Sequence, residues 1–251
     1  KTEPMLRFRE ELKQRLHGTV WEAGCTSWYK TATGEQTNNW PGLAFSYRMR
    51  VGVIVGGERH VADSVLRVEW RDTRLSGLPH GGVDYQPRVW GEAVALDLGE
   101  KDVLFELLTG VSVSSGYPAT GATRLLHNQV KTLHPEAAGL DFFDRIREVR
   151  DTFNLPTADQ PVFVRFRDIH DLTSVERVDG GNFEALYGPG SALEPVTVQV
   201  TDDESQKKLV KIAPAVGEFA AKRPPVSLSG SAIARTNTTL ADRLTGLDFS
   251  R

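Results

Sequence analysis

The stretch LAFSYRMRVGVIV, residues 43–55, places an apolar residue at every second position, with small or charged residues between them. Successive side chains of an extended chain point to opposite sides, so this pattern predicts a long β-strand with one apolar face. The residues GGER at 56–59 are typical of a hairpin turn. The stretch HVADSVLRVEW at 60–70 ends in a similar alternation and is the expected return strand. The sequence therefore predicts an antiparallel hairpin as the centre of the fold.

Several later stretches also have strand-like patterns, at 89–98, 162–166 and 196–200. Residues 103–108 are apolar and fit either a strand or a short helix. Helical spacing of apolar residues is confined to short stretches, at 5–16, 125–133, 140–150 and 183–187, the last with Asn182 as a candidate cap. Hairpin-linked strands pair antiparallel, whereas parallel pairs need long crossovers. We therefore predict an α+β fold, predominantly antiparallel β-sheet with a few short helices.

The composition excludes several classes of function. The net charge of −3 gives no electrostatic reason to expect a nucleic-acid partner. Cys25 is the only cysteine, so neither an internal disulfide nor a cysteine zinc cluster is expected, and the six histidines are scattered without metal-ligand spacing. No apolar run approaches the roughly 20 residues that cross a bilayer, and the first residues, KTEP, are not those of a signal peptide. We expect no metal site and no transmembrane segment.

The N-terminal part resembles a known enzyme family. Residues 24–29, GCTSWY, and 37–42, TNNWPG, lead into FSYR at 45–48. Over residues 5–50 this resembles the C-terminal end of Baeyer–Villiger-type flavin monooxygenases. The resemblance implies a family that binds FAD and NADPH on two glycine-rich strand–turn–helix units, where helix N-termini hold the pyrophosphates. The sequence contains no G-x-G-x-x-G, so we expect this chain to bind neither cofactor by itself.

A second resemblance begins near residue 47 and extends to 203. It rests on SVLRVEW at 64–70, GEAVALDL at 91–98, VRFRD at 164–168 and TSVERVD at 173–179. These residues are similar to an uncharacterised bacterial lipoprotein-like family, whose members often start with a lipoprotein-type signal. The resemblance implies an exported, β-rich protein and brings no known activity.

The two resemblances divide the chain into three regions. Residues 1–42 are a monooxygenase-like segment, 43–203 a β-rich domain, and 204–251 a polar C-terminal region that we expect to be poorly ordered. Within the last region, Leu240, Leu244, Leu247 and Phe249 are expected to form a docking turn. A natural fusion, a misassigned reading frame and an engineered chimera would each produce such a chain.

Charged residues cluster on the loop around 165–179. The candidate interaction residues there are Arg165, Arg167, Asp168, Arg177 and Asp179, accompanied by Asp171 and Glu176. Paired carboxylates of this kind can act as acid and base or bind calcium, although the spacing of a calcium-binding loop is absent. The favoured alternative is a charged loop that holds two strands in register, in which Asp168 and Asp171 cap their own backbone.

Aromatic residues near the N-terminus form a second candidate group. Trp28, Tyr29 and Trp40 are able to line a pocket, but the favoured interpretation is a core. We expect at least two of Trp21, Trp28 and Trp40 to be buried against the face that carries Phe45 and Tyr47.

No catalytic constellation is evident: the nucleophile elbow G-x-S-x-G is absent, and Cys25 has no cationic neighbour in sequence. This absence favours a non-catalytic binding or structural module, with self-association or a protein partner. The second resemblance implies the bacterial envelope as its location, and a cytoplasmic location is the alternative. The alternative to a binding or structural module is a fragment or accessory of an FAD/NADPH-dependent monooxygenase.

Overall fold

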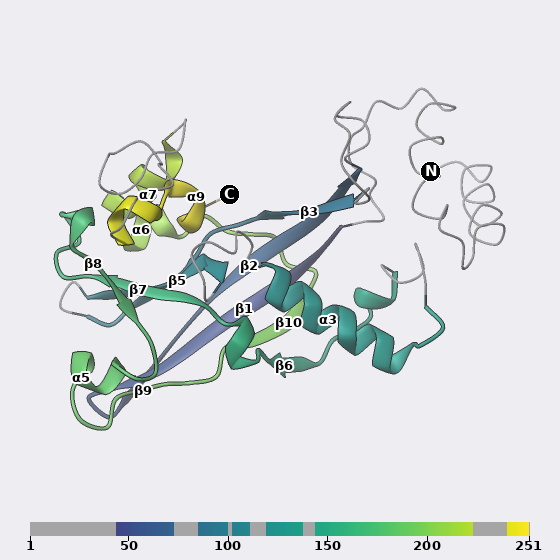
Figure 1. Ribbon diagram of the computed structural model, residues 1–251, viewed down its shortest axis with the longest axis horizontal. Helices are drawn as coiled ribbons and strands as arrows, with labels where there is room; N and C mark the ends of the chain where they lie inside the picture. The colour runs from purple at the N-terminus through teal and green to yellow at the C-terminus, as the bar shows by residue number, and fades with distance from the viewer. Residues whose placement is uncertain are drawn as a thin grey trace.

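The computed structural model describes residues 44–72, 85–99, 102–110, 119–137, 144–222 and 240–250. The predicted hairpin is its longest feature (Figure 1). Strand β1 (Ala44–Val55) pairs antiparallel with β2 (Glu58–Asp72) along its whole length. Gly56 and Gly57 join them with φ of 59° and 81°, the left-handed conformation that a two-residue hairpin turn requires.

The hairpin forms the centre of the first sheet, in the order β3-β2-β1-β10-β6. Its other members are β3 (Tyr85–Trp90), β6 (Thr152–Asn154), β9 (Ala192–Leu193) and β10 (Thr197–Thr201), and every pairing is antiparallel. Strands β9 and β10 both pair with β1, at residues 53–54 and 46–50 respectively. The alternation predicted for 43–55 is confirmed, because Phe45, Tyr47, Met49, Val51 and Val53 are all buried.

A second antiparallel sheet has the order β4-β5-β7-β8. It consists of β4 (Val94–Asp97), β5 (Val103–Gly110), β7 (Pro161–Phe166) and β8 (Val175–Val178). The stretch 103–108, which fits strand or helix by sequence, is therefore a strand. Together the two sheets confirm the predicted α+β, predominantly antiparallel fold.

The predicted strand at 89–98 is wrong as a single element. It divides into the end of β3 and the whole of β4 at Gly91, whose φ is 142°. A Cβ at this position would lie 2.5 Å from Leu66 Cδ2 and 3.0 Å from the Val65 carbonyl oxygen. Only glycine combines this backbone conformation with so close an approach. Gly91 thus redirects the chain from the first sheet into the second.

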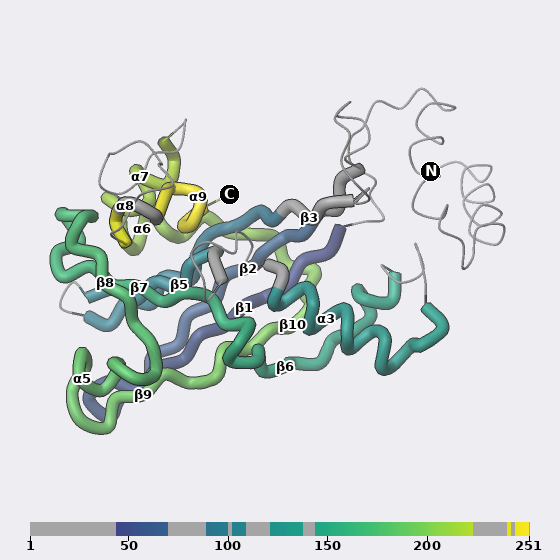
Figure 2. Tube along the Cα trace, viewed as in Figure 1, coloured from purple at the N-terminus to yellow at the C-terminus, as the bar shows by residue number. Residues whose placement is uncertain are grey.

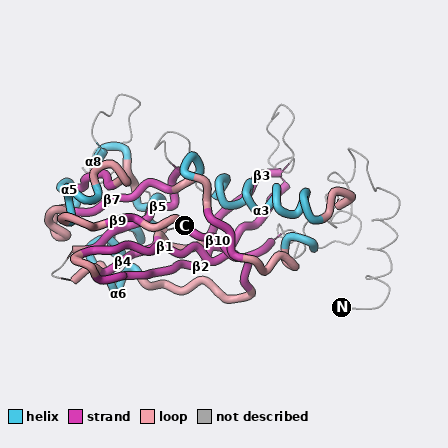
Figure 3. Tube along the Cα trace, turned by 90° about the horizontal axis from the view of Figure 1, so that it is seen from below, coloured by secondary structure: helices cyan, strands magenta, loops and turns pink. Residues whose placement is uncertain are grey.

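The two sheets enclose the main core. The layer opposite the first sheet consists of the second sheet and α3 (Ala119–Leu133) (Figure 3). The α3 residues Ala122, Leu126 and Val130 are buried in this core beside Leu104, Phe163 and Val178 of the second sheet. Helix α3 contains the predicted helix at 125–133 but begins six residues earlier.

The opposite face of the second sheet carries a separate core. Phe105, Val164 and Phe166 pack there against four short helices, α6 (Leu209–Ile212), α7 (Pro214–Ala221), α8 (Leu240–Arg243) and α9 (Gly246–Phe249). These helices gather on one side of the molecule (Figure 2). The expected docking turn near the C-terminus is confirmed by buried Leu244 and Phe249. Residues 209–222 and 240–250 lie in the region that was expected to be poorly ordered, but they contain these four helices. Helices this short lack the long periodic pattern from which a helix is predicted.

Two further predicted helices differ in detail from those in the structure. Helix α5 (Phe183–Tyr187) forms where expected, but Asn182 does not cap it through its side chain. That side chain instead accepts from Asp179 N at 2.7 Å and donates to Arg177 O at 2.9 Å, closing the preceding turn. The helix expected at 140–150 is too long, since only 144–146 is helical among its described residues. Residues 1–43, including the expected helix at 5–16, lie outside the described residues.

Candidate functional site

The structure separates the predicted charged cluster by strand alternation. Arg165 on β7 points toward the main core and donates from Nε to Glu176 Oε1 at 2.5 Å, across a register pair of β7 and β8. Its guanidinium also lies 3.5 Å from Asp102 Oδ2 and 5.1 Å from the ring centre of Tyr187. Burial raises the pKa of Asp102, and the charge of Arg165 offsets only part of this effect.

The other predicted residues of this cluster lie elsewhere. Arg167 and Arg177 are exposed and do not join Arg165. Asp168 Oδ1 accepts from His170 N at 2.9 Å, and Asp179 Oδ1 accepts from Gly181 N at 2.9 Å. Asp171 Oδ1 likewise accepts from Thr173 N at 3.0 Å. The contacts of Asp168 and Asp171 agree with the interpretation that these acids cap their own backbone. Arg165 and Glu176 pair across two neighbouring strands, and whether they hold the strands in register stays a prediction.

The aromatic candidates Trp28, Tyr29 and Trp40, together with Trp21, lie outside the described residues. Their expected burial against Phe45 and Tyr47 stays a prediction.

A buried carboxyl group stands out in the main core. Glu106 on β5 is only 2% exposed, and neither of its side-chain oxygens has a hydrogen-bond partner among the described residues. It borders a cavity of about 10 Å³, about the space of one water molecule. Burial raises the pKa of Glu106 well above its usual value, which favours the neutral acid. The cavity is too small for a larger ligand.

A larger, open groove of about 330 Å³ lies on the outer face of the first sheet. Strands β1 and β2 contribute Arg48, Asp63 and Val65, whose side chains lie on the face opposite Tyr47 and Met49. The segment 202–208, which we call the strap, runs from β10 to α6 and supplies the remaining wall through Asp203, Glu204, Ser205, Gln206 and Lys208.

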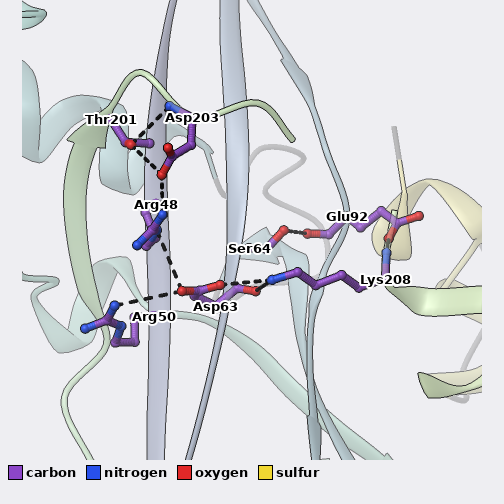
Figure 4. Close-up of polar contacts among 8 residues, drawn as sticks. All are labelled: Arg48, Arg50, Asp63, Ser64, Glu92, Thr201, Asp203 and Lys208. Carbon is purple, nitrogen blue, oxygen red and sulfur yellow. Dashed lines mark hydrogen bonds and ion pairs between the residues drawn. The ribbon is translucent and has the colours of Figure 1, made fainter. Parts of the chain in front are cut away.

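Three cations converge on the carboxylate of Asp63 (Figure 4). Lys208 Nζ lies 3.1 Å from Asp63 Oδ1, while Arg48 Nε and Arg50 Nη2 lie 3.7 and 3.8 Å from Oδ2. Arg48 forms a second ion pair with Asp203 of the strap. Asp63 is thus shared between cations from β1 and from the strap, so it orders both walls of the groove.

The end of the strap is fixed by Glu92, which lies at the corner between β3 and β4. Its Oε2 accepts from the backbone N–H groups of Lys208 at 2.6 Å and Leu209 at 3.0 Å. The carbonyl oxygen of Glu92 accepts from Ser64 Oγ at 2.7 Å, which ties the corner to β2 (Figure 4). Lys208 is therefore held at a defined place beside Asp63.

Sequence reasoning missed both Glu106 and the groove. Glu106 had a readable signal, because a single acid interrupts the apolar run VLFELL at 103–108. The alternation places Arg48 and Asp63 on the polar face of the hairpin. The contact between Asp63 and Lys208 joins residues 145 positions apart, which no local pattern predicts.

Within the described part of the chain, histidine, cysteine and acidic side chains form no group of three that could hold a metal ion. None of the described helices is both long and apolar enough to cross a membrane. No family model, no curated protein and no solved structure matches this chain.

Proposed function

We propose that this chain is a non-catalytic binding module whose groove on the outer face of the first sheet takes a small polar ligand. The observation that carries the proposal is the convergence of Arg48, Arg50 and Lys208 on Asp63 at the wall of an open groove.

The size and the walls of the groove support a small polar ligand. A volume of about 330 Å³ is within the range of small-molecule sites. Its lining is largely charged and hydroxyl or amide side chains, with Val65 as an apolar exception. Such walls recognise hydrogen-bonding and charged groups, whereas a large apolar ligand would leave them unpaired.

The construction of the groove supports binding more than chemistry. Its charged side chains pair with one another and are anchored from β1, β2 and the Glu92 corner, which holds a binding surface in shape before a ligand arrives. Preorganisation of this kind lowers the entropic cost of binding. The location in the bacterial envelope belongs to the same proposal and rests on the resemblance of residues 47–203 alone.

The test is titration of the isotope-labelled full chain, followed by amide NMR, with inorganic phosphate, succinate, glycine, sucrose and spermidine. We expect at least one compound to shift the resonances of Arg48, Val65 and Asp203 in a saturable way. Ser205→Trp should abolish these shifts, because Ser205 lines the groove and a bulky side chain would fill it.

Lys207→Trp is the matched control, since Lys207 is an exposed strap residue that does not line the groove. It should bind as the unchanged chain does. Absence of saturable shifts with all five compounds, or shifts that Ser205→Trp leaves intact, would overturn the proposal.

A further inference from the structure

We infer that the strap, residues 202–208, is a gate that ion pairs hold closed over the outer face of the first sheet. This inference rests on the proposed binding function and adds its regulation, because the strap supplies one wall of the groove. A closed strap retains the ligand. Salt weakens exposed ion pairs, so a rise in ionic strength favours the open strap and release of the ligand.

The middle of the strap makes no polar contact that would hold it in place. Residues 202–207 are all exposed and belong to no helix or strand. Within the described part of the chain, Glu204, Ser205, Gln206 and Lys207 form no hydrogen bond and no ion pair. Exposed backbone without such bonds opens at a low cost in free energy. The closed position of the strap therefore depends on its two ends.

Ion pairs hold these two ends on neighbouring strands (Figure 4). At the start of the strap, Asp203 pairs with Arg48 of β1. At its end, Lys208 Nζ lies 3.1 Å from Asp63 Oδ1 on β2. Arg48 Nε and Asp63 Oδ2 are 3.7 Å apart, so the four side chains form one row of alternating charge across the hairpin. The two ends of the strap are thus linked electrostatically through the sheet.

The exposure of these side chains makes the latch weak. The exposed fraction ranges from 27% for Asp63 to 55% for Asp203. An ion pair with this much solvent contact shifts an equilibrium by only about 1.5- to 5-fold. The ion pairs can therefore be broken by moderate changes in ionic strength, as a gate requires.

A comparison of two valines shows which part of the sheet is covered. Val65 and Val61 both lie on the outer face of β2, four residues apart. Val65 lines the groove beside the strap and is 8% exposed, whereas Val61 does not line the groove and is 42% exposed. Burial of an apolar side chain favours the closed strap, in addition to the ion pairs.

The test uses the rate at which trypsin cleaves the full chain after Lys207. The bond that is cut includes the amide nitrogen of Lys208, which donates to Glu92 Oε2 at 2.6 Å. Cleavage requires this end of the strap to leave the sheet, so the rate reports the population of the open strap. Each rate is divided by that of a peptide of residues 201–211 with the same substitution at the same salt, which removes direct effects on the protease.

Asp203→Asn removes the ion pair at the opposite end of the strap. If the strap opens as a unit, this change should raise the normalised cleavage rate after Lys207 by about 1.5- to 5-fold. Glu204→Gln is the matched control, because it makes the same charge change on the next residue, which has no ion pair among the described residues. Its rate should equal that of the unchanged chain.

Raising the salt concentration from about 20 mM to about 500 mM should also raise the rate of the unchanged chain. The rise should be smaller for Asp203→Asn, because screening has one ion pair fewer to weaken. The inference fails if Asp203→Asn and Glu204→Gln are cleaved at the same rate, or if the rate of the unchanged chain does not depend on salt. These measurements are made without ligand, so their outcome is separate from that of the NMR titrations that test the proposed function.

Discussion

Tyr47 on β1 and Glu106 on β5 are buried between the two sheets, and neither side chain has a hydrogen-bond partner among the described residues. Burial raises the pKa of Tyr47, and the charge of Glu106 adds to that rise. Burial likewise raises the pKa of Glu106. Unpaired polar groups in a core reduce stability, because water no longer solvates them. These two buried groups therefore lower the free energy of unfolding.

The first prediction is that replacing Glu106 stabilises the protein, and more so at higher pH. The folded state binds the proton of Glu106 more tightly than the unfolded state, because burial raises the folded pKa above its ordinary value of 4.5. Below pH 4.5 the acid is neutral in both states, so its ionisation does not affect the free energy of unfolding. Above pH 4.5 the unfolded state ionises first, so the free energy of unfolding falls as the pH rises toward the folded pKa. Glu106→Gln, which carries no titrating proton, should gain stability relative to the unchanged chain between pH 4 and pH 8.

Glu106→Leu also removes the unpaired oxygens, and should stabilise the fold by about 1–3 kcal/mol at pH 4. Urea unfolding at pH 4, 6 and 8 measures both effects. Glu58→Gln is the control, because Glu58 is exposed at the start of β2. A stability difference between Glu106→Gln and the unchanged chain that does not vary with pH would contradict the prediction.

The second prediction concerns the corner at Gly91. Gly91→Ala should destabilise the protein by about 1–3 kcal/mol, since alanine at a φ of 142° is strained and its Cβ would meet Leu66 and the Val65 carbonyl. Gly99→Ala is the comparison, because Gly99 also has a positive φ of 83° but a Cβ there would meet nothing within 4 Å. Thermal unfolding of both variants separates backbone strain from the clash. Equal losses would show that the close approach to β2 contributes nothing.

Local pattern was sufficient to predict the hairpin and the strands at 162–166 and 196–200, because side-chain alternation is a property of neighbouring residues. The division at Gly91 was not predictable in this way, since it depends on Leu66 occupying the space that a side chain would need. The same limit applies to the groove. Arg48, Asp63 and Lys208 meet only because β2 pairs with β1 and the strap returns across them.

The third prediction tests the link between β7 and β8. Arg165 and Glu176 are opposite in register and their side chains are 18% and 29% exposed. A double-mutant cycle with Arg165→Gln and Glu176→Gln should give a coupling energy of about 1 kcal/mol, the upper end for pairs that retain some solvent contact. The cycle is measured by urea unfolding at low and at high salt. A coupling near zero would mean that backbone pairing alone sets the register of these strands.

The last prediction concerns the C-terminal helices. Phe249 is fully buried, and its ring contacts those of Phe105, Phe166 and Phe219 at centroid distances of 5.8, 6.2 and 6.4 Å. Thr245 and Asp248 form a capping box that fixes the turn carrying it. Phe249→Ala should therefore destabilise the whole protein by about 3–5 kcal/mol, because it leaves a cavity between the second sheet and its helices.

Val210→Ala is the control for Phe249→Ala, since Val210 lies on α6 in the same group of helices but is 53% exposed. It should cost less than about 1 kcal/mol. Urea unfolding followed by both far-ultraviolet circular dichroism and fluorescence distinguishes the two possible outcomes for Phe249→Ala. A single, weakened transition means that the helices and the sheets unfold together. An early helical transition with the sheet transition unchanged would show instead that the C-terminal helices unfold independently. The core between these helices and the second sheet would then not stabilise the two sheets.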